Sequence, residues 1–120
     1  MLLDSSSLLN LSGSTVLLAD DNDDLRRYIA GALAKAFKVV QVSNGQDALD
    51  YALRSPPALI VSDVQMPRLD GPGLLRALRS NPTTALIPSE YLPHLITSGS
   101  LLLGVTRLVT ASQSSPDRSS

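Results

Sequence analysis

Acidic side chains follow two apolar segments of this 120-residue chain, in each case directly where the apolar segment ends. Asp63 comes after residues 58–62 (ALIVS) and precedes a loop that contains proline and glycine. The acidic run at 20–24 (DDNDD) comes after residues 16–19 (VLLA). An open parallel α/β sheet carries its reactive groups at the carboxyl ends of short buried strands. We therefore expect the carboxylates of the two segments to lie close together.

Carboxylates held together repel one another unless a cation binds among them. Mg²⁺ suits such a site, because it takes one or two protein carboxylates and shares its remaining positions with water and phosphate. The metal would neutralise charge on a phosphoryl group and leave one carboxylate free to attack it. Asp63, alone at its strand end, is the expected nucleophile, and Asp20 and Asp21 are the expected metal ligands.

Simpler interpretations compete with this one. The acidic run alone is typical of a solvated turn and helix N-terminus, and a single Asp before a loop is often a turn former. A calcium-binding EF-hand loop starts with a similar alternation of Asp and Asn. Here, however, Leu25 stands where that loop needs glycine, and Gly31 where it needs glutamate. The position of both acidic segments at the same end of neighbouring strands favours a functional site.

The elements that must position these residues alternate along the chain. Apolar or β-branched runs predict strands, and recurrence of apolar residues every three or four positions predicts helices. The expected order is strand 16–19, a helix of roughly four turns through 25–36, strand 38–42, a helix around 48–53, strand 58–62 and helix 71–80. Pro56 and Pro57 end the second helix, because proline lacks the backbone donor that a helix needs.

Three successive strand–helix units predict an α/β fold with a doubly wound parallel sheet. These units occupy residues 16–80, and residues 81–110 leave room for roughly one more, so the sheet is expected to be incomplete. The expected organisation is a flexible Ser-rich leader at 1–14, a folded domain at 15–88, an atypical segment at 89–110 and a disordered tail at 111–120.

Composition narrows the choice of partners and compartment. A net charge of −1 with 18% charged residues offers no basic surface for nucleic acid. No apolar run reaches membrane-spanning length, and the N-terminal residues lack the basic and apolar regions of a secretory signal. The absence of cysteine excludes disulfides and thiolate metal sites. We expect a cytoplasmic protein that binds neither nucleic acid nor membranes.

Three spaced motifs resemble the receiver domain of two-component response regulators and hybrid histidine kinases: VLLADDN at 16–22, NGQDAL at 44–49 and LIVSDVQMPRLDG at 59–71. The resemblance covers residues 15–88 and implies a flavodoxin-like sheet with strand order 2-1-3-4-5. It also implies that Asp63 is the phosphoacceptor. The phosphoryl donor would be a phosphohistidine on a histidine kinase or a histidine phosphotransfer protein.

The resemblance further implies the remaining site residues. The implied metal ligands are Asp20, Asp21, Asp63 and the backbone carbonyl of Gln65, and the implied loop-shaping residues are Pro67 and Gly71. Such a domain is not an enzyme acting on other substrates, because it catalyses only its own phosphorylation and dephosphorylation.

The chain departs from the family in its second half. The family uses a Ser or Thr at the end of its fourth strand and a Lys at the end of its fifth. The only lysines here, Lys35 and Lys38, come too early for that role, and Thr97 is the one candidate for the switch hydroxyl. His94 is the only histidine, and without companions it is interpreted as a surface or packing residue.

Without proper fourth and fifth strands, residues 58–62 are expected to form an apolar sheet edge that invites self-association. Three functions compete. The first is a phosphorelay receiver, and the second is a truncated receiver-like module that binds a kinase or phosphotransfer partner without efficient phosphorylation. The third is a Mg²⁺-dependent phosphatase, which needs a second acid two residues after its nucleophile, where this chain has Gln65.

Overall fold

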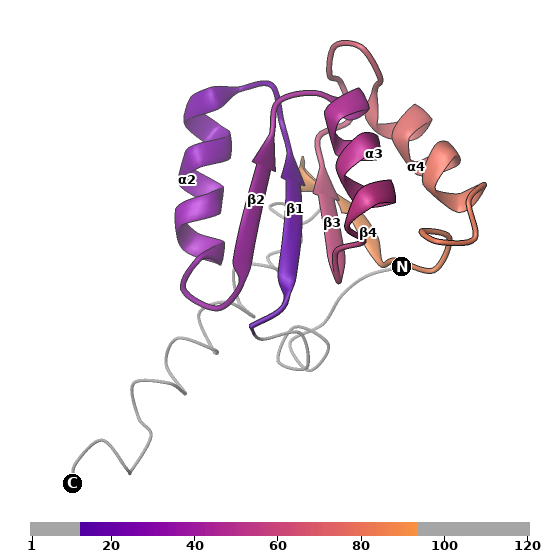
Figure 1. Cartoon of the computed structure of the whole chain (residues 1–120). Coiled ribbons are helices and arrows are strands. Elements are labelled where there is room, and N and C mark those ends of the chain that lie inside the picture. The colour runs from indigo at the N-terminus through magenta and orange to yellow at the C-terminus, as the bar shows by residue number, and fades with distance from the viewer. Residues whose placement is uncertain (1–12, 94–120) are drawn as a thin grey trace, which may run out of the picture.

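Four parallel strands form one sheet in residues 13–93, the part of the chain that the computed structural model describes (Figure 1). The strands are β1 (Thr15–Ala19), β2 (Lys38–Val42), β3 (Leu59–Ser62) and β4 (Ser89–Tyr91). Their order across the sheet is β2-β1-β3-β4. The expected parallel sheet, with its first strand inside and its second at the edge, is confirmed.

The central strands β1 and β3 read as continuous apolar runs because both faces of the sheet are covered there. All four side chains of β3 are buried, as are four of the five in β1. β1 pairs in parallel with both neighbours, so that Leu17 lies opposite Val40 of β2 and Ile60 of β3. The register places the carboxyl ends of these three strands side by side at one end of the sheet.

Three helices connect the strands: α2 (Asp23–Leu33), α3 (Gly45–Arg54) and α4 (Gly71–Arg79). Each begins after an Asn or Asp whose side-chain oxygen accepts a hydrogen bond from a backbone amide in the first turn. These N-cap residues are Asn22, Asn44 and Asp70. The side chains satisfy amides that lack a partner within the helix, which explains why the helices start where they do.

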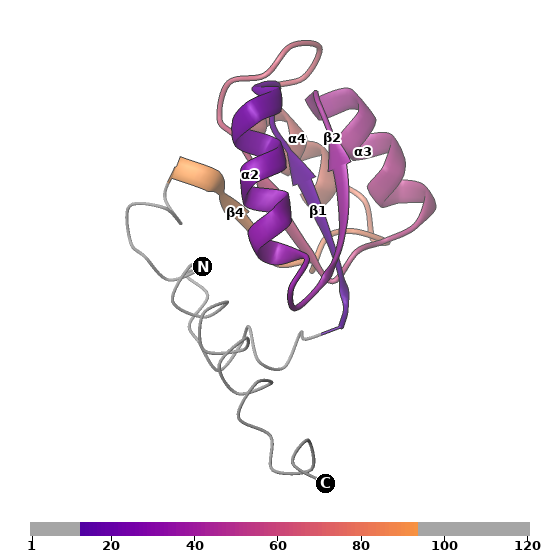
Figure 2. The same ribbon diagram turned by 90° about the vertical axis from the view of Figure 1, so that its left-hand side faces the viewer.

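The helices cover the two faces of the sheet unequally. α2 lies on one face and α3 and α4 on the other (Figure 2). The core under α2 contains Val16, Leu18, Ile29, Leu33, Phe37, Leu59 and Val61. The core under α3 and α4 contains Leu17, Ala19, Ala48, Ala52, Ile60, Leu74 and Leu78. Alternate residues of β1 and β3 therefore supply the two cores.

The first helix is shorter than the sequence predicts. α2 ends at Leu33, and both Ala36 and Phe37 direct their backbone amides to the Leu33 carbonyl. The chain turns here so that Phe37, which is only 5% exposed, enters the core under α2 just before β2 begins. Tertiary burial of one aromatic side chain thus ends the helix before its apolar pattern ends.

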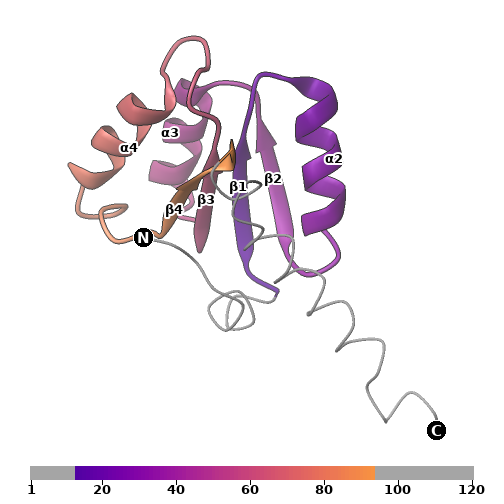
Figure 3. The same cartoon turned by 180° about the vertical axis from the view of Figure 1, so that it is seen from behind.

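The prediction that residues 58–62 form an unpaired edge is wrong. β3 pairs with β1 on one side and with β4 on the other, where Ile60 lies opposite Ser89 and Val61 opposite Glu90 (Figure 3). The pairing uses backbone groups, and the Ile60 amide also donates to the carbonyl of Pro88. A strand therefore forms at 89–91 although its side chains show no strand pattern. Self-association through an exposed sheet edge stays a prediction.

Several predictions concern residues outside the described range. They are the leader up to residue 12, His94, Thr97, the segment 94–110 and the tail at 111–120. No helix within residues 13–93 is long and apolar enough to cross a membrane.

Candidate functional site

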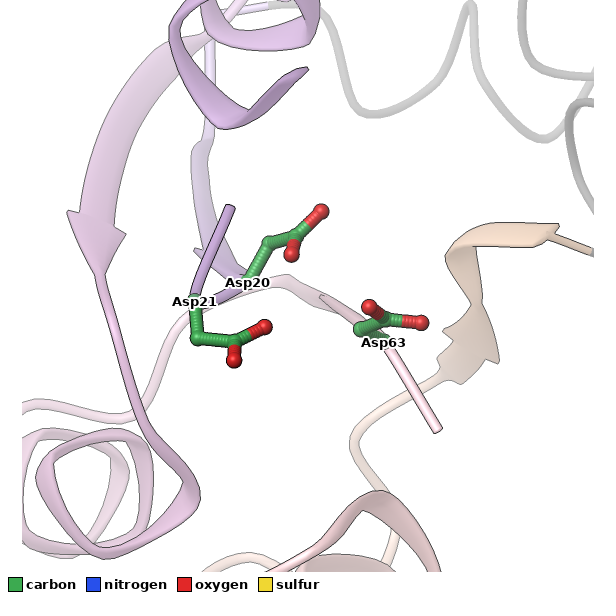
Figure 4. A group of neighbouring side chains, drawn as sticks. All are labelled: Asp20, Asp21 and Asp63. Atoms are coloured by element: carbon green, nitrogen blue, oxygen red, sulfur yellow. The ribbon is translucent and has the colours of Figure 1, made fainter. Parts of the chain in front are cut away.

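The carboxyl ends of β1 and β3 meet at one edge of the sheet, and each is followed by an aspartate (Figure 4). The ladder continues one residue beyond the strands. The Asp63 amide donates to the carbonyl of Ala19 at 2.9 Å, and the Asp20 amide donates to the carbonyl of Val42 at 3.1 Å. Backbone pairing thus places the Asp20 and Asp63 side chains beside each other.

Three carboxylates come together at this edge. One oxygen each from Asp20, Asp21 and Asp63 lies within 4.8 Å of the others. Asp20 is fully buried, Asp63 is half-buried and Asp21 is exposed, so the group runs from the protein interior to the solvent. Oxygen ligands at this spacing suit a hard divalent cation such as Mg²⁺.

Asp20 carries the clearest electrostatic signature of the site. Its Oδ1 accepts a 2.9 Å hydrogen bond from the Asn22 amide, whereas its buried Oδ2 has no hydrogen-bond partner among residues 13–93. Burial raises the pKa of the Asp20 carboxyl, the Asn22 amide opposes this, and the charges of Asp63 and Asp21 raise the pKa further. A cation bound to the free oxygen would offset both the cost of burying the charged carboxylate and its repulsion by the neighbouring carboxylates.

The loop after Asp63 forms the other wall of the site. The Val64 amide donates to Asp63 Oδ1 at 2.8 Å, and the Gly71 amide donates to the Val64 carbonyl at 2.8 Å, which closes the loop. An open hollow at its mouth is lined by Asp21, Asn22, Asp63, Val64, Gln65, Met66 and Pro67. Gln65 and Pro67 thus lie in the loop at the hollow, where the resemblance placed them.

Two glycines let the loop pack closely. A β-carbon at Gly71 would overlap the backbone oxygen of Asp63 and lie 2.9 Å from the Tyr91 ring. A β-carbon at Gly45, the first residue of α3, would overlap the backbone oxygen of Leu69. The loop is therefore held between the start of α4 and the start of α3, and side chains at these two positions would displace it.

The structure brings together the Asp20, Asp21 and Asp63 side chains that the sequence singled out. It offers no Ser or Thr at the end of β4, because the strand ends at Tyr91 and is followed by Leu92 and Pro93.

Both lysines lie far from the site. Lys38 is the first residue of β2 and pairs with Thr15, so it lies at the amino-terminal end of the strands, whereas Asp63 lies at the carboxyl end. Lys35 is in the turn before Lys38. Within the described residues, no lysine therefore replaces the family's Lys.

Sequence reasoning missed two residues at the site. Arg26 donates hydrogen bonds to the turn after β1 and to β2, and no local pattern signals such contacts. Gly45 meets Leu69 in the loop after Asp63, 24 residues away in sequence. Gly45 belongs to the NGQDAL motif at 44–49, but the residue that it contacts depends on the assembled fold.

The family described as the response regulator receiver domain matches residues 16–89. Among curated proteins, the chain is 34% identical over 90 residues to histidine kinase P4 of Formosa agariphila. It is 43% identical over 82 residues to the gliding motility regulatory protein of Myxococcus xanthus. These matches cover 75% and 67% of this chain but only 6% and 10% of those proteins, so the chain spans a small part of their length.

Solved structures give the same picture. The chemotaxis response regulator CheY4 of Vibrio cholerae is 26% identical, with a TM-score of 0.64 over 67% of this chain and 68% of that one. The receiver domain of sensor histidine kinase PA1611 from Pseudomonas aeruginosa is 27% identical, with a TM-score of 0.64 over 67% and 66%. The latter structure holds a magnesium ion coordinated in its active site cleft. The flavodoxin-like fold is confirmed by these similarities.

Proposed function

This chain belongs to the family of response regulator receiver domains, and on that premise we propose that Asp63 accepts a phosphoryl group from a phosphohistidine with the help of bound Mg²⁺. Receiver domains are signalling modules of two-component phosphorelays that interact with histidine kinases or phosphotransfer proteins. The observation that carries the proposal is the meeting of the Asp20, Asp21 and Asp63 carboxylates within 4.8 Å.

The donor set fits Mg²⁺. Asp20 offers a buried oxygen without a partner among the described residues, and Asp21 offers an exposed carboxylate next to it. We assign Asp20, Asp21, Asp63 and the backbone carbonyl of Gln65 as the protein ligands. When bound, the metal supplies positive charge that offsets the charge of the phosphoryl oxygens during transfer. Pro67 and Gly71 hold the loop that carries the Gln65 carbonyl.

Asp63 performs the covalent step. One of its carboxylate oxygens forms a bond to phosphorus while the bond between phosphorus and the imidazole nitrogen breaks, and the electron pair of that bond stays on the imidazole. The Val64 amide orients the carboxylate through its hydrogen bond to Oδ1. Because Asp63 is half-buried at an open hollow, a histidine on another protein can approach it. We place this exchange in the cytoplasm, in keeping with a chain that has no cysteine.

A second candidate function is a receiver-like interaction module that binds a kinase or phosphotransfer partner without efficient phosphorylation. The end of β4 favours it, because Tyr91, Leu92 and Pro93 provide no Ser or Thr hydroxyl for the phosphoryl group. The two lysines also lie at or before the amino-terminal end of β2, away from Asp63. With fewer groups to stabilise the transferred phosphate, transfer should be slow even if Asp63 is competent.

Mass spectrometry after incubation with a small phosphodonor and Mg²⁺ tests the first function. We expect the wild type to gain the mass of one phosphoryl group and Asp63→Asn to gain none. Asp50→Asn is the matched control, because Asp50 is an exposed carboxylate on α3 that only accepts a hydrogen bond from Gln46. It should be phosphorylated like the wild type. No mass gain in the wild type would sink the proposal.

Partner binding separates the second function from the first. A purified histidine phosphotransfer domain that binds wild type and Asp63→Asn equally, with or without Mg²⁺, while neither protein gains phosphate, would establish the interaction module. Binding that needs Mg²⁺ or Asp63 would favour the phosphorelay receiver.

A further inference from the structure

Arg26, on the first full turn of α2, makes contacts that no other basic residue of the described chain makes. Its Nη1 donates to the backbone carbonyl of Asp20 at 3.0 Å and to Asp23 Oδ1 at 2.7 Å. Its Nε donates to the side-chain oxygen of Gln41 at 3.2 Å. The side chain is only 11% exposed although it is charged. A guanidinium on a largely covered side chain, with three acceptors on three segments, is expected to hold those segments in a defined arrangement.

The segments that Arg26 joins are the ones that shape the acidic site. Asp20 belongs to the turn between β1 and α2, Asp23 to the first turn of α2 and Gln41 to β2. The Asp20 carbonyl that accepts from Arg26 belongs to the peptide unit between Asp20 and Asp21. Fixing this peptide fixes the directions in which both neighbouring carboxylates leave the backbone.

We propose that Arg26 is a positioning residue for the metal site: it holds the β1–α2 turn so that the Asp20 and Asp21 carboxylates face Asp63. The metal part of this inference rests on the proposed function. Arg26 itself touches neither the metal nor the phosphoryl group. It acts through the Asp20 backbone and through its anchor on β2.

Removing Arg26 should change the affinity for Mg²⁺ in opposite directions, depending on whether Arg26 acts through its charge or through its hydrogen bonds. A cation near a Mg²⁺ site repels the metal, so removing a guanidinium that acts only through charge should strengthen Mg²⁺ binding. Removing a guanidinium that positions the ligands should weaken binding instead. The sign of the change in affinity therefore distinguishes the two roles.

Arg27 provides a matched control. It is exposed, it lies one residue further along α2, and it has the same charge, yet its side chain makes no hydrogen bond within residues 13–93. Arg27→Gln thus reports the effect of losing one positive charge near the site. Arg26→Lys keeps the charge of Arg26 but replaces the planar fork with a single ammonium group, which cannot reproduce its contacts to three segments.

Two measurements on the folded variants test the proposal. Amide hydrogen exchange of the metal-free protein follows the amides of Asp20 and Asn22, which donate to Val42 and to Asp20 Oδ1. Calorimetric titration measures the Mg²⁺ dissociation constant. We expect Arg26→Gln to speed exchange at both amides and to weaken Mg²⁺ binding, each by roughly tenfold, since hydrogen bonds to charged groups are worth more than neutral ones. Arg26→Lys should fall between Arg26→Gln and the wild type, and Arg27→Gln should leave exchange unchanged.

The proposal is overturned if Arg26→Gln exchanges at the wild-type rate, if it binds Mg²⁺ as tightly as Arg27→Gln or more tightly, or if Arg26→Lys matches the wild type in both measurements. Failure of the proposed function has a different signature. In that case the wild type itself binds no Mg²⁺ and gains no phosphate, while amide exchange still decides whether Arg26 holds the turn.

Discussion

The two chain segments that build the site are held in different ways. The turn between β1 and α2 is held by polar side chains, through the bonds of Arg26 and the Asn22 cap. The loop between β3 and α4 is held by close packing of backbone atoms, which is possible because Gly45 and Gly71 have no side chains. The β1–α2 turn should therefore be sensitive to changes in charge and to metal binding. The β3–α4 loop should be sensitive to any substitution that adds side-chain volume.

This difference assigns distinct tasks to the two segments. The carboxylates of Asp20 and Asp21 repel each other and that of Asp63 at short range. Polar contacts on the β1–α2 turn keep the two side chains oriented despite this repulsion. The proposed function requires the loop to keep its place beside Asp63 when a phosphoryl group is bound there, and close packing resists displacement because packed interiors have low compressibility. The predictions below test this comparison.

The largest effect is expected at the packed loop. Gly45→Ala would force a methyl group into the Leu69 backbone, and we expect it to lower the free energy of unfolding by about 3 kcal/mol. Urea denaturation measures this. Gly31→Ala is the matched control, because a β-carbon there meets nothing and the substitution should raise stability by up to about 1 kcal/mol in a helix. A Gly45→Ala cost below that of an ordinary surface change would refute the packing argument.

A smaller effect is expected from the caps, one in each segment. Asn22→Ala and Asp70→Ala each remove an exposed side-chain acceptor for a first-turn amide, from Leu25 and Gly73 respectively. Each should cost about 1 kcal/mol of unfolding free energy in the metal-free protein. Thermal or urea unfolding can compare the two variants side by side. Strongly unequal costs would show that one of these side chains does more than cap its helix.

The third prediction concerns pH and metal. Because the pKa of Asp20 is raised in the folded protein, the folded state holds this proton more tightly than the unfolded chain does. Metal-free stability should therefore fall as pH rises from the ordinary value of 3.8 through the folded pKa, and stay lower at neutral pH. Asp20→Asn removes this loss while keeping an oxygen for the Asn22 amide.

Asp20→Asn should thus be more stable than the wild type at neutral pH in a chelator, and the advantage should vanish below pH 3.8. Adding Mg²⁺ should stabilise the wild type and leave the variant nearly unchanged. Thermal denaturation with and without Mg²⁺ checks both statements. A variant that is less stable than the wild type in chelator at neutral pH contradicts the electrostatic account.

The smallest effect is expected at Arg68, in the loop but on its surface. Arg68 adopts a φ of 70°, which favours glycine, and it pairs with Asp47 at 3.2 Å with both side chains about half exposed. Arg68→Gly relieves the strain but loses an exposed ion pair and adds chain entropy, so we expect unfolding free energy to change by less than about 1 kcal/mol. A larger loss in urea denaturation would mean that side-chain contacts, and not only close backbone packing, hold this loop.

Much of the site could be predicted from local sequence. The aspartates follow apolar runs, and parallel strands have their carboxyl ends on the same side of the sheet, so the sequence alone predicts that Asp20 and Asp63 are neighbours. The start of α4 at Gly71 is also predicted correctly, whereas α2 and α3 begin earlier than their apolar patterns suggest, because Asn22 and Asn44 cap them. The end of α2 is not predicted correctly, since the burial of Phe37 overrides the helical pattern of the preceding alanines.

The sequence by itself determined the strand–helix order, the three carboxylates and their common edge, because these follow from short-range periodicity and from the direction of parallel strands. Only the tertiary structure decided that Ser89–Tyr91 pairs with β3, that the backbone of Leu69 packs against Gly45 and that Arg26 joins the β1–α2 turn to β2. These contacts join residues that are distant in sequence and depend on backbone proximity or on side-chain reach. Neither property leaves a periodic signal along the chain.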